Sequence, residues 1–208
     1  MKKRLKNELQ KLKYENQPIK FSFIGMTLMF FCLFLLITAT FLQVPFEFQG
    51  GAGEKLFQYL YVPQVPAVMF IAVLLGVKMG VSVILLYILL GMFFPIFALG
   101  GGPEYILKPV FGYIVAYVPA VMCAGVLTKK DASFLGILKS AAACTFIIHF
   151  LGMMYSFSVM AITNVWSDDI FNFLFLQSGI KLLYDYILCI LAAYIANMAK
   201  RIIWVFAG

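Results

Sequence analysis

The sequence predicts an all-α integral membrane protein: a bundle of six transmembrane helices with both termini in the cytoplasm. Three observations lead to this prediction: the composition, six apolar runs of spanning length, and the distribution of basic residues. Of the 208 residues 63% are hydrophobic and only 12% are charged, and the mean hydropathy is +0.97. A soluble domain is nearer half apolar and a quarter charged, so one soluble core cannot bury this surplus. The chain therefore belongs in a lipid bilayer.

The first element is a basic segment, residues 1–20, which we expect on the cytoplasmic side. Its basic residues are Lys2, Lys3, Arg4, Lys6, Lys11, Lys13 and Lys20. It is too polar for a signal peptide, and charge just before an apolar run suits the anionic cytoplasmic leaflet. Leu5, Leu9 and Leu12 recur at helical spacing, which indicates a short surface helix, although a solvated tail that only orients the chain explains the charge as well. The net charge of +7 thus indicates a membrane surface and not a nucleic-acid partner.

Six apolar runs follow, in what we treat as a single transmembrane domain over residues 21–208 without internal repeats. Each is near the ~20 residues that a helix needs to cross a bilayer. The runs are Phe21–Val44, Tyr61–Gly76, Val77–Phe97, Pro109–Thr128, Phe134–Ile162 and Phe171–Phe206. The second run is short and its junction with the third, LLGVKMG, is tight, whereas the last two are long enough to tilt.

The charges orient these six runs. With an even number of spans both termini share a side, and most of the 16 basic residues fall there: the basic segment, Lys78, Lys129, Lys130, Lys139, Lys200 and Arg201. Only Lys55, Lys108 and Lys181 fall near the opposite side. This bias predicts a multi-pass protein of the cell membrane with cytoplasmic termini. The outer side then carries 44–60, which we expect to be a long loop, the stretch 95–117, and a loop at 164–171.

The outer stretch 95–117, PIFALGGGPEYILKPVFGYIVAY, holds candidate binding residues. Glycines such as Gly101 allow backbone N–H groups to approach a ligand closely. Glu104 and Lys108 flank Tyr105 at a spacing of four, which suits either a polar contact to a solute or an exposed ion pair that contributes almost nothing.

Lys181 and Asp185 lie inside the sixth apolar run, four residues apart, so they share one helix face. Ionisable groups at membrane depth are costly unless they pair or line a polar cavity, and they commonly mark a functional site. A structural ion pair, or a lysine that extends to the membrane surface, is the alternative.

Aromatic residues near the outer side are candidates for the walls of a pocket, namely Tyr87, Phe97, Tyr113, Tyr117 and Trp166. An interfacial aromatic belt, common to membrane proteins, is the alternative for each. Gln64 opens the second run, where an amide in an apolar setting needs a hydrogen-bond partner from protein or ligand. His149, the one histidine of the sequence, is expected to form hydrogen bonds within the bundle and not to act as a catalyst.

Several absences narrow the function. The sequence has no P-loop, no HExxH and no GxSxG, and we predict that it is not an enzyme. Its cysteines lie in apolar runs without a CxxC pair, which favours buried small residues over a disulfide or metal site, and no cofactor is expected. Secondary transporters usually have more spans and a repeat with broken helices. The pattern therefore favours a binding component that captures a small solute.

The middle of the chain resembles the BioY family. PIFALGG followed by LKPVFGYIVAYVPA is similar to that family's LPVFAGG leading into GPTGGYLIGF, and the preceding runs follow its order of motifs. Matching positions are Gln64, Gly76, Tyr87, Gly91, Pro95, Phe97, Ala98, Gly100, Gly101, Pro109, Gly112 and Tyr113. The resemblance covers the second to fourth runs well and the others weakly.

The resemblance implies a six-helix S component of an energy-coupling-factor (ECF) transporter, which captures biotin from outside and works with a transmembrane T protein and two ATPases. Asp185 falls on an aspartate of the family's last helix. The lysine that follows it there falls near Leu188, and Lys181 lies one turn earlier instead. Val110 and Phe111 stand where the family has Thr and Gly.

We therefore predict capture of biotin or a related small carboxylate. Lys181 or Lys108 would hold the carboxylate, Asp185, Gln64 and Tyr87 would bind the polar head, and 97–105 would form a lid. An S component for another vitamin, or a structural membrane protein without a ligand, remains the alternative.

Overall fold

The computed structural model describes residues 22–49, 55–98, 100–163 and 176–207. Its elements are α2 (Phe23–Phe41), β1 (Val44–Gln49), β2 (Lys55–Tyr61), α3 (Gln64–Phe93), the 3-10 helix η1 (Pro103–Leu107), α4 (Phe111–Lys130), α5 (Phe134–Thr163), the π-helical turn η2 (Leu176–Ile180) and α7 (Lys181–Ala207). Five helices in these ranges are long and apolar enough to cross a membrane, so the predicted helical, multi-pass membrane class is confirmed. The expected surface helix before residue 21 and the loop with Trp166 lie outside the described residues.

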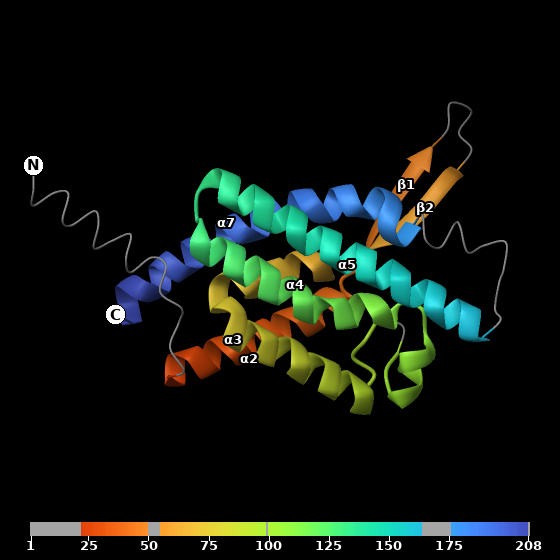
Figure 1. The fold of residues 1–208 in the computed structure, drawn as a ribbon, viewed down its shortest axis with the longest axis horizontal. Helices are drawn as coiled ribbons and strands as arrows, with labels where there is room; N and C mark the ends of the chain where they lie inside the picture. Colours follow the sequence, from red (N-terminus) through yellow and green to blue (C-terminus); the bar gives the residue numbers. More distant parts are fainter. Residues whose placement is uncertain (1–21, 50–54, 99, 164–175, 208) are drawn as a thin grey trace, which may run out of the picture.

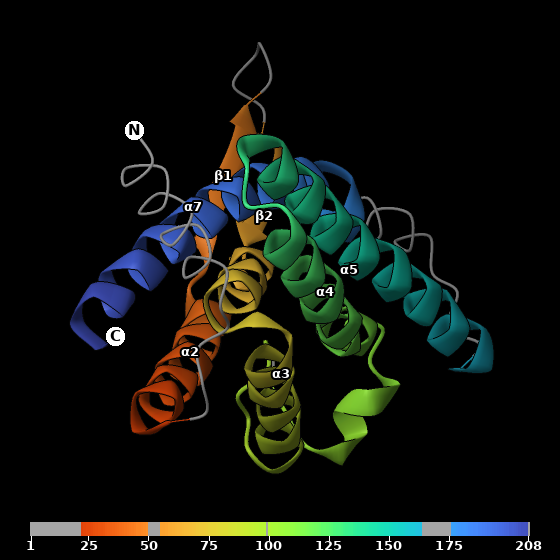
Figure 2. The same cartoon turned by 60° about the vertical axis from the view of Figure 1, so that its left-hand side comes forward.

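The helices run back and forth between two ends of the bundle (Figure 1). One end carries the start of α2, the turn between α4 and α5, and the end of α7, while the other carries the β1–β2 hairpin, η1 and the end of α5. Helix α3 packs against α2, α4 and α7, and α5 packs against α4 and α7. Figure 2 shows α3 between α2 and α4. Side chains that α3, α4, α5 and α7 turn inward therefore meet in the middle of the bundle.

Helix α3 reverses direction at Gly76. Gly76 has φ 72° and ψ −172°, a backbone conformation that is essentially restricted to glycine. A Cβ placed on Gly80 would lie 3.6 Å from the carbonyl oxygen of Ile71, although nine residues of straight helix would separate them by about 13.5 Å. The two arms, 64–75 and 77–93, are thus antiparallel, and Figure 1 shows the chain turning back between them. The break lies at the junction that the sequence predicts between the second and third runs.

The expectation of a long loop over 44–60 is wrong, because β1 and β2 form an antiparallel hairpin there. Val44 pairs with Tyr61 and Glu47 with Gln58, and the register shifts between Phe48 and Gln49. The sequence VPFEFQ alternates apolar and polar residues, the period of a strand, and it is rich in the aromatic residues that strands favour. That alternation was the missed signal, since the nearby glycines alone favour a loop.

Helix α7 presents a narrow buried stripe to its neighbours. The buried residues recur every three or four positions: Lys181, Asp185, Cys189, Ala193 and Ala196. Its exposed side is apolar, with Leu183, Ile187 and Leu191, as a face toward lipid should be. Small residues on the buried stripe allow close helix approach, and the stripe points Lys181 and Asp185 into the bundle.

Candidate ligand-binding site

The first polar cluster surrounds Gln64, at the start of α3. The Gln64 Nε2 donates hydrogen bonds to Thr40 Oγ1 of α2 (2.7 Å) and to the hydroxyl of Tyr87 on the second arm of α3 (3.0 Å). Its Oε1 accepts from the hydroxyl of Tyr117 on α4 (2.9 Å). All four side chains are buried, so one amide joins three helices in the interior.

These hydrogen bonds occupy both donors and one acceptor position of the Gln64 amide. An amide nitrogen has two N–H groups, and both are donated to protein oxygens. Thr40 donates to the Leu36 carbonyl (2.9 Å), so the hydroxyl of Tyr87 donates to Thr40 Oγ1 across their 3.0 Å contact. Every donor of the cluster thus has an acceptor within the protein. The partner that the sequence required for Gln64 is therefore supplied by the protein itself.

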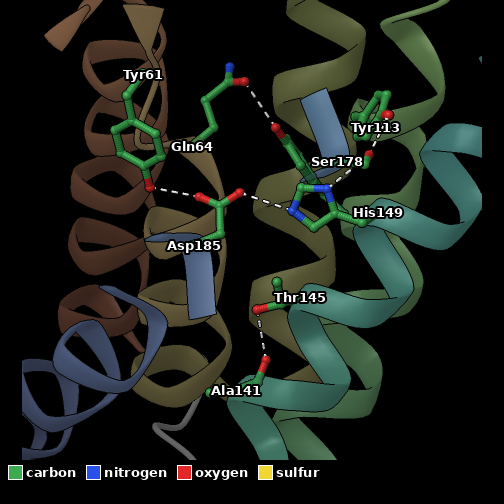
Figure 3. Close-up of polar contacts among 9 residues, drawn as sticks. Tyr61, Gln64, Tyr113, Ala141, Thr145, His149, Ser178 and Asp185 are labelled. Carbon is green, nitrogen blue, oxygen red and sulfur yellow. Dashed lines mark hydrogen bonds and ion pairs between the residues drawn. The ribbon is translucent and has the colours of Figure 1, made fainter. Parts of the chain in front are cut away.

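The second cluster centres on Asp185, which is fully buried (Figure 3). Its Oδ1 accepts from the hydroxyl of Tyr61 at the end of β2 (2.6 Å), and its Oδ2 lies 3.1 Å from Nε2 of His149 on α5. The other ring nitrogen of His149 lies 3.1 Å from Oγ of Ser178 in η2, which in turn lies 2.7 Å from the hydroxyl of Tyr113 on α4. A buried carboxylate is costly unless it is hydrogen-bonded, and this chain of contacts supplies the bonds.

Lys181 is the first residue of α7 and lies one turn before Asp185. The two residues share one buried helix face, as the sequence predicts. Its side chain is 8% exposed, and the hydrogen bonds and ion pairs found among the described residues do not include it. The carboxylate of Asp185 meets Tyr61 and His149 instead. The two residues thus share the buried face without forming the structural ion pair that was the alternative. A lysine at this depth, with no anionic partner among the described residues, favours the approach of an anion.

Aromatic residues cover the bundle between α3 and α4. The ring of Phe97 lies 5.4 Å from that of Tyr87 and 4.9 Å from that of Tyr105, and it rests directly on Gly91, where any Cβ would overlap it. Tyr105 is 1% exposed and donates to the carbonyl of Ala98, and burial raises the pKa of its hydroxyl to about 12. The segment around η1 is therefore folded inward.

The glycines of this segment are used largely by the protein's own backbone. Gly102 (φ 90°) donates its N–H to the Gly91 carbonyl (2.8 Å), and the Gly100 N–H goes to the Phe97 carbonyl (3.1 Å). A Cβ on Gly101 would lie only 2.2 Å from the carbonyl oxygen of Phe94. Close backbone packing is thus one reason for three glycines in a row.

The structure divides the predicted site residues into two groups. The buried ones face the interior: Gln64, Tyr87, Phe97, Tyr105, Tyr113, Tyr117, Lys181 and Asp185. Glu104 and Lys108 are exposed on η1 and just after it, and the ammonium of Lys108 lies 4.9 Å from the centre of the Tyr105 ring. Their roles toward a ligand, and that of Gly101, stay predictions.

Sequence reasoning missed Thr40, Tyr61 and Ser178. Each is an isolated polar group in or beside an apolar run, and such a group needs a partner when it is buried. That signal was available, but the identity of the partners depends on the tertiary fold. For His149 the expected role of bundle hydrogen-bonder is confirmed by its contacts with Asp185 and Ser178.

One known protein family matches nearly the whole chain. The sequence model of the BioY family matches residues 14–204. The chain belongs to the BioY family. One relative, the biotin transporter BioY of Thermotoga maritima, is 30% identical over 141 residues, which are 67% of this chain and 79% of the relative. Membership of this transporter family agrees with the expectation that the chain is not an enzyme.

The fold of this BioY-family chain is also similar to a solved structure. The crystal structure of the S component for biotin from an ECF-type ABC transporter matches with a TM-score of 0.56 at 23% sequence identity. The match covers 85% of this chain and 90% of that chain, so the S-component fold extends over nearly the whole bundle.

Proposed function

We propose that this chain is an S component that captures biotin from the outer side of the cell membrane for ATP-driven uptake. Membership of the BioY family supports the transport function. The observation that supports the site is Lys181, a buried cation to which the described residues give no anionic partner, one turn from the fully buried Asp185. Biotin offers a carboxylate to a cation and a ureido ring that needs both donors and acceptors.

The two ends of the ligand would meet different groups. Lys181 holds the carboxylate through a charge-assisted hydrogen bond, and the exposed Lys108 is the alternative holder. The polar head of the ligand would contact Asp185, Gln64 and Tyr87. Both N–H groups of the Gln64 amide already donate within the protein, so Gln64 must release one of these partners before it can donate to the ligand. The inward-folded segment 97–105, with Phe97 and Tyr105, acts as a lid.

The topology that we propose has six crossings within a single domain, 21–208, after a cytoplasmic segment 1–20. Each arm of α3 crosses once, and the shorter arm, 64–75, covers only about 18 Å, so it begins below the outer surface. Lys78, Lys129 and Lys130 all lie near reversals at the same end of the bundle, which supports a cytoplasmic location of that end.

The partners follow from the same assignment. The chain itself has no P-loop, so ATP hydrolysis comes from two ATPase subunits, joined to it by a transmembrane T protein. The apolar exposed faces of its helices contact the lipid bilayer.

Equilibrium binding of radiolabelled biotin to the purified protein tests the proposal. We expect saturable binding that falls at least tenfold in Lys181→Ala and Asp185→Ala, because each removes a charged hydrogen-bonding group. Lys139→Ala removes an exposed lysine of α5 and is the matched control, with unchanged affinity. No saturable binding, or equal affinities of parent and site variants, would exclude the biotin assignment.

Two other functions are separated by a thermal-shift screen of vitamins and small carboxylates. An S component for another vitamin is favoured by the position of Lys181 before Asp185 and by Leu188 after it. A ligand at 100 times its Kd stabilises the protein by ~2.7 kcal/mol, so the true ligand raises the Tm most. A structural protein without ligand agrees with the internal pairing around Gln64, but membership of a transporter family argues against it.

A further inference from the structure

The carboxylate of Asp185 is held by two donors from outside its own helix. Tyr61 reaches Oδ1 from the end of β2, and His149 reaches Oδ2 from α5. On α7 itself, Lys181 lies one turn before and the apolar Leu188 nearly one turn after, and neither is found in a hydrogen bond or ion pair with this carboxylate among the described residues. Tyr61 and His149 are therefore the partners of this carboxylate among the described residues, and His149 is the one that makes a further contact through a second ring nitrogen.

The contacts favour one tautomer of His149. A carboxylate that is ionised only accepts hydrogen bonds, so an ionised Asp185 requires a hydrogen on Nε2, which faces Oδ2 at 3.1 Å. In the neutral ring Nδ1 then accepts from Ser178, and the Ser178 oxygen accepts from the hydroxyl of Tyr113. The result is a directed chain of donors that starts on α4, passes through η2 and α5, and ends at Asp185 on α7.

Each member of this chain of hydrogen bonds is buried, and two further features of the structure surround it. His149 is 1% exposed, Ser178 9% and Tyr113 7%. Ser178 lies in the π-helical turn η2, directly before α7, and π-helical turns occur often at functional sites. The ring of Tyr113 also packs edge-on against that of His149, with the centroids 6.0 Å apart. The imidazole is thus fixed in orientation by a hydrogen bond at each nitrogen and by an aromatic neighbour.

We infer that His149 is a positioning residue for the ligand site, acting through Asp185 by the Nε2–H donation that Ser178 and Tyr113 orient. This inference rests on the proposed role of Asp185 in binding the ligand's polar head. His149 holds Oδ2, so the orientation of the carboxylate is already set when the ligand arrives. A polar N–H of the ligand then shares Oδ1 with Tyr61 or replaces its hydroxyl. Preorganisation of this kind raises affinity because the ligand does not have to order the group it binds.

The first test observes the parent protein directly. His149 is the one histidine of this sequence, so the full chain labelled with [15N]histidine, and purified on a tag without histidine, gives a single set of imidazole nitrogen signals in NMR. We expect a protonated Nε2, either in the neutral ring or in imidazolium. A neutral ring with its hydrogen on Nδ1 would overturn the inference, because Nε2 would then point a lone pair at the carboxylate.

The second test compares two substitutions that each keep one ring nitrogen. Glutamine places an amide N–H near the position of Nε2, whereas asparagine places its amide near Nδ1. We expect His149→Gln to bind biotin within about threefold of the parent and His149→Asn to lose on the order of tenfold or more. Equal losses in the two variants, or no loss in either, would contradict a positioning role.

Thr145→Val is the matched control for the helix. Thr145 lies one turn before His149 on the same face of α5, and its hydroxyl donates to the Ala141 carbonyl of its own helix (2.9 Å; Figure 3). We expect unchanged biotin affinity in this variant. If the parent does not bind biotin, the proposed function fails, while the NMR measurement still decides whether His149 donates to Asp185. The same measurement decides alone if neither His149 variant folds.

Discussion

Replacing Gln64 by leucine, which is of similar size, should destabilise the ligand-free protein strongly. The variant removes three hydrogen bonds at once, to Thr40, Tyr87 and Tyr117. Thr40 and Tyr87 keep each other as partners at 3.0 Å. The Tyr117 hydroxyl, on a side chain 2% exposed, keeps no acceptor among the described residues. At about 1 kcal/mol for each lost bond, the free energy of unfolding falls by about 3 kcal/mol.

Thermal unfolding of the purified protein in detergent, without ligand, measures this effect. For a chain of this size each kcal/mol changes the Tm by about 2–4 °C, so the Tm should fall by roughly 6–12 °C. Tyr117→Phe removes one of the three bonds and should lower the Tm by about a third as much. The double variant should be less destabilised than the sum of the two, since the bond between these side chains is lost only once.

The reasoning would be refuted if Gln64→Leu lowered the Tm by less than about 2 °C. It would also be refuted if the double variant were strictly additive, because the Oε1 contact at 2.9 Å would then carry no energy.

Three further predictions concern single residues. Lys181→Met should raise the Tm of the ligand-free protein, because it removes a charge from an apolar setting. It should also weaken biotin binding at least tenfold in calorimetry, because it removes the proposed partner of the carboxylate. A lower Tm, or an unchanged affinity, would contradict this prediction. Gly76→Ala should lower the free energy of unfolding by about 1–3 kcal/mol, because alanine is strained at φ 72° and ψ −172°, and chemical denaturation would disprove this by showing parent stability. Gly91→Ala should displace the ring of Phe97, whose atoms would lie as close as 2.0 Å to the new methyl group, and so accelerate proteolysis around 97–105; an unchanged cleavage rate would count against the packing described.

The helices were predictable because a bilayer imposes a simple rule on the sequence. Apolar runs of spanning length placed α2, α4 and α5 within a few residues of their observed bounds. The boundary inside α3 was predicted at Gly76, where glycine alone suits the backbone. The hairpin at 44–61 was missed because a two-stranded element needs only a short alternating pattern, and nearby glycines indicate a loop equally well.

The site was predictable in its residue types but not in its pairings. Lys181 and Asp185 stood out because ionisable groups are rare in an apolar run. Their spacing placed them on one helix face, with a structural ion pair as the alternative, yet Asp185 meets Tyr61, 124 residues away along the chain, and His149, 36 residues away. Glu104 and Lys108 have the same spacing and were also predicted as binding residues, but both are exposed on the surface at η1.

The sequence alone determined that this protein lies in a lipid bilayer, which segments cross the bilayer, and which few polar groups need hydrogen-bond partners inside it. These properties are local, since each depends on the residues of one segment and their transfer between water and lipid. Only the tertiary structure decided which groups meet. The reversal at Gly76 brings Gln64 to Tyr87, and the packing of α5 against α7 brings His149 to Asp185. Hydrogen bonds act over about 3 Å, and no local pattern fixes contacts of that length between distant helices.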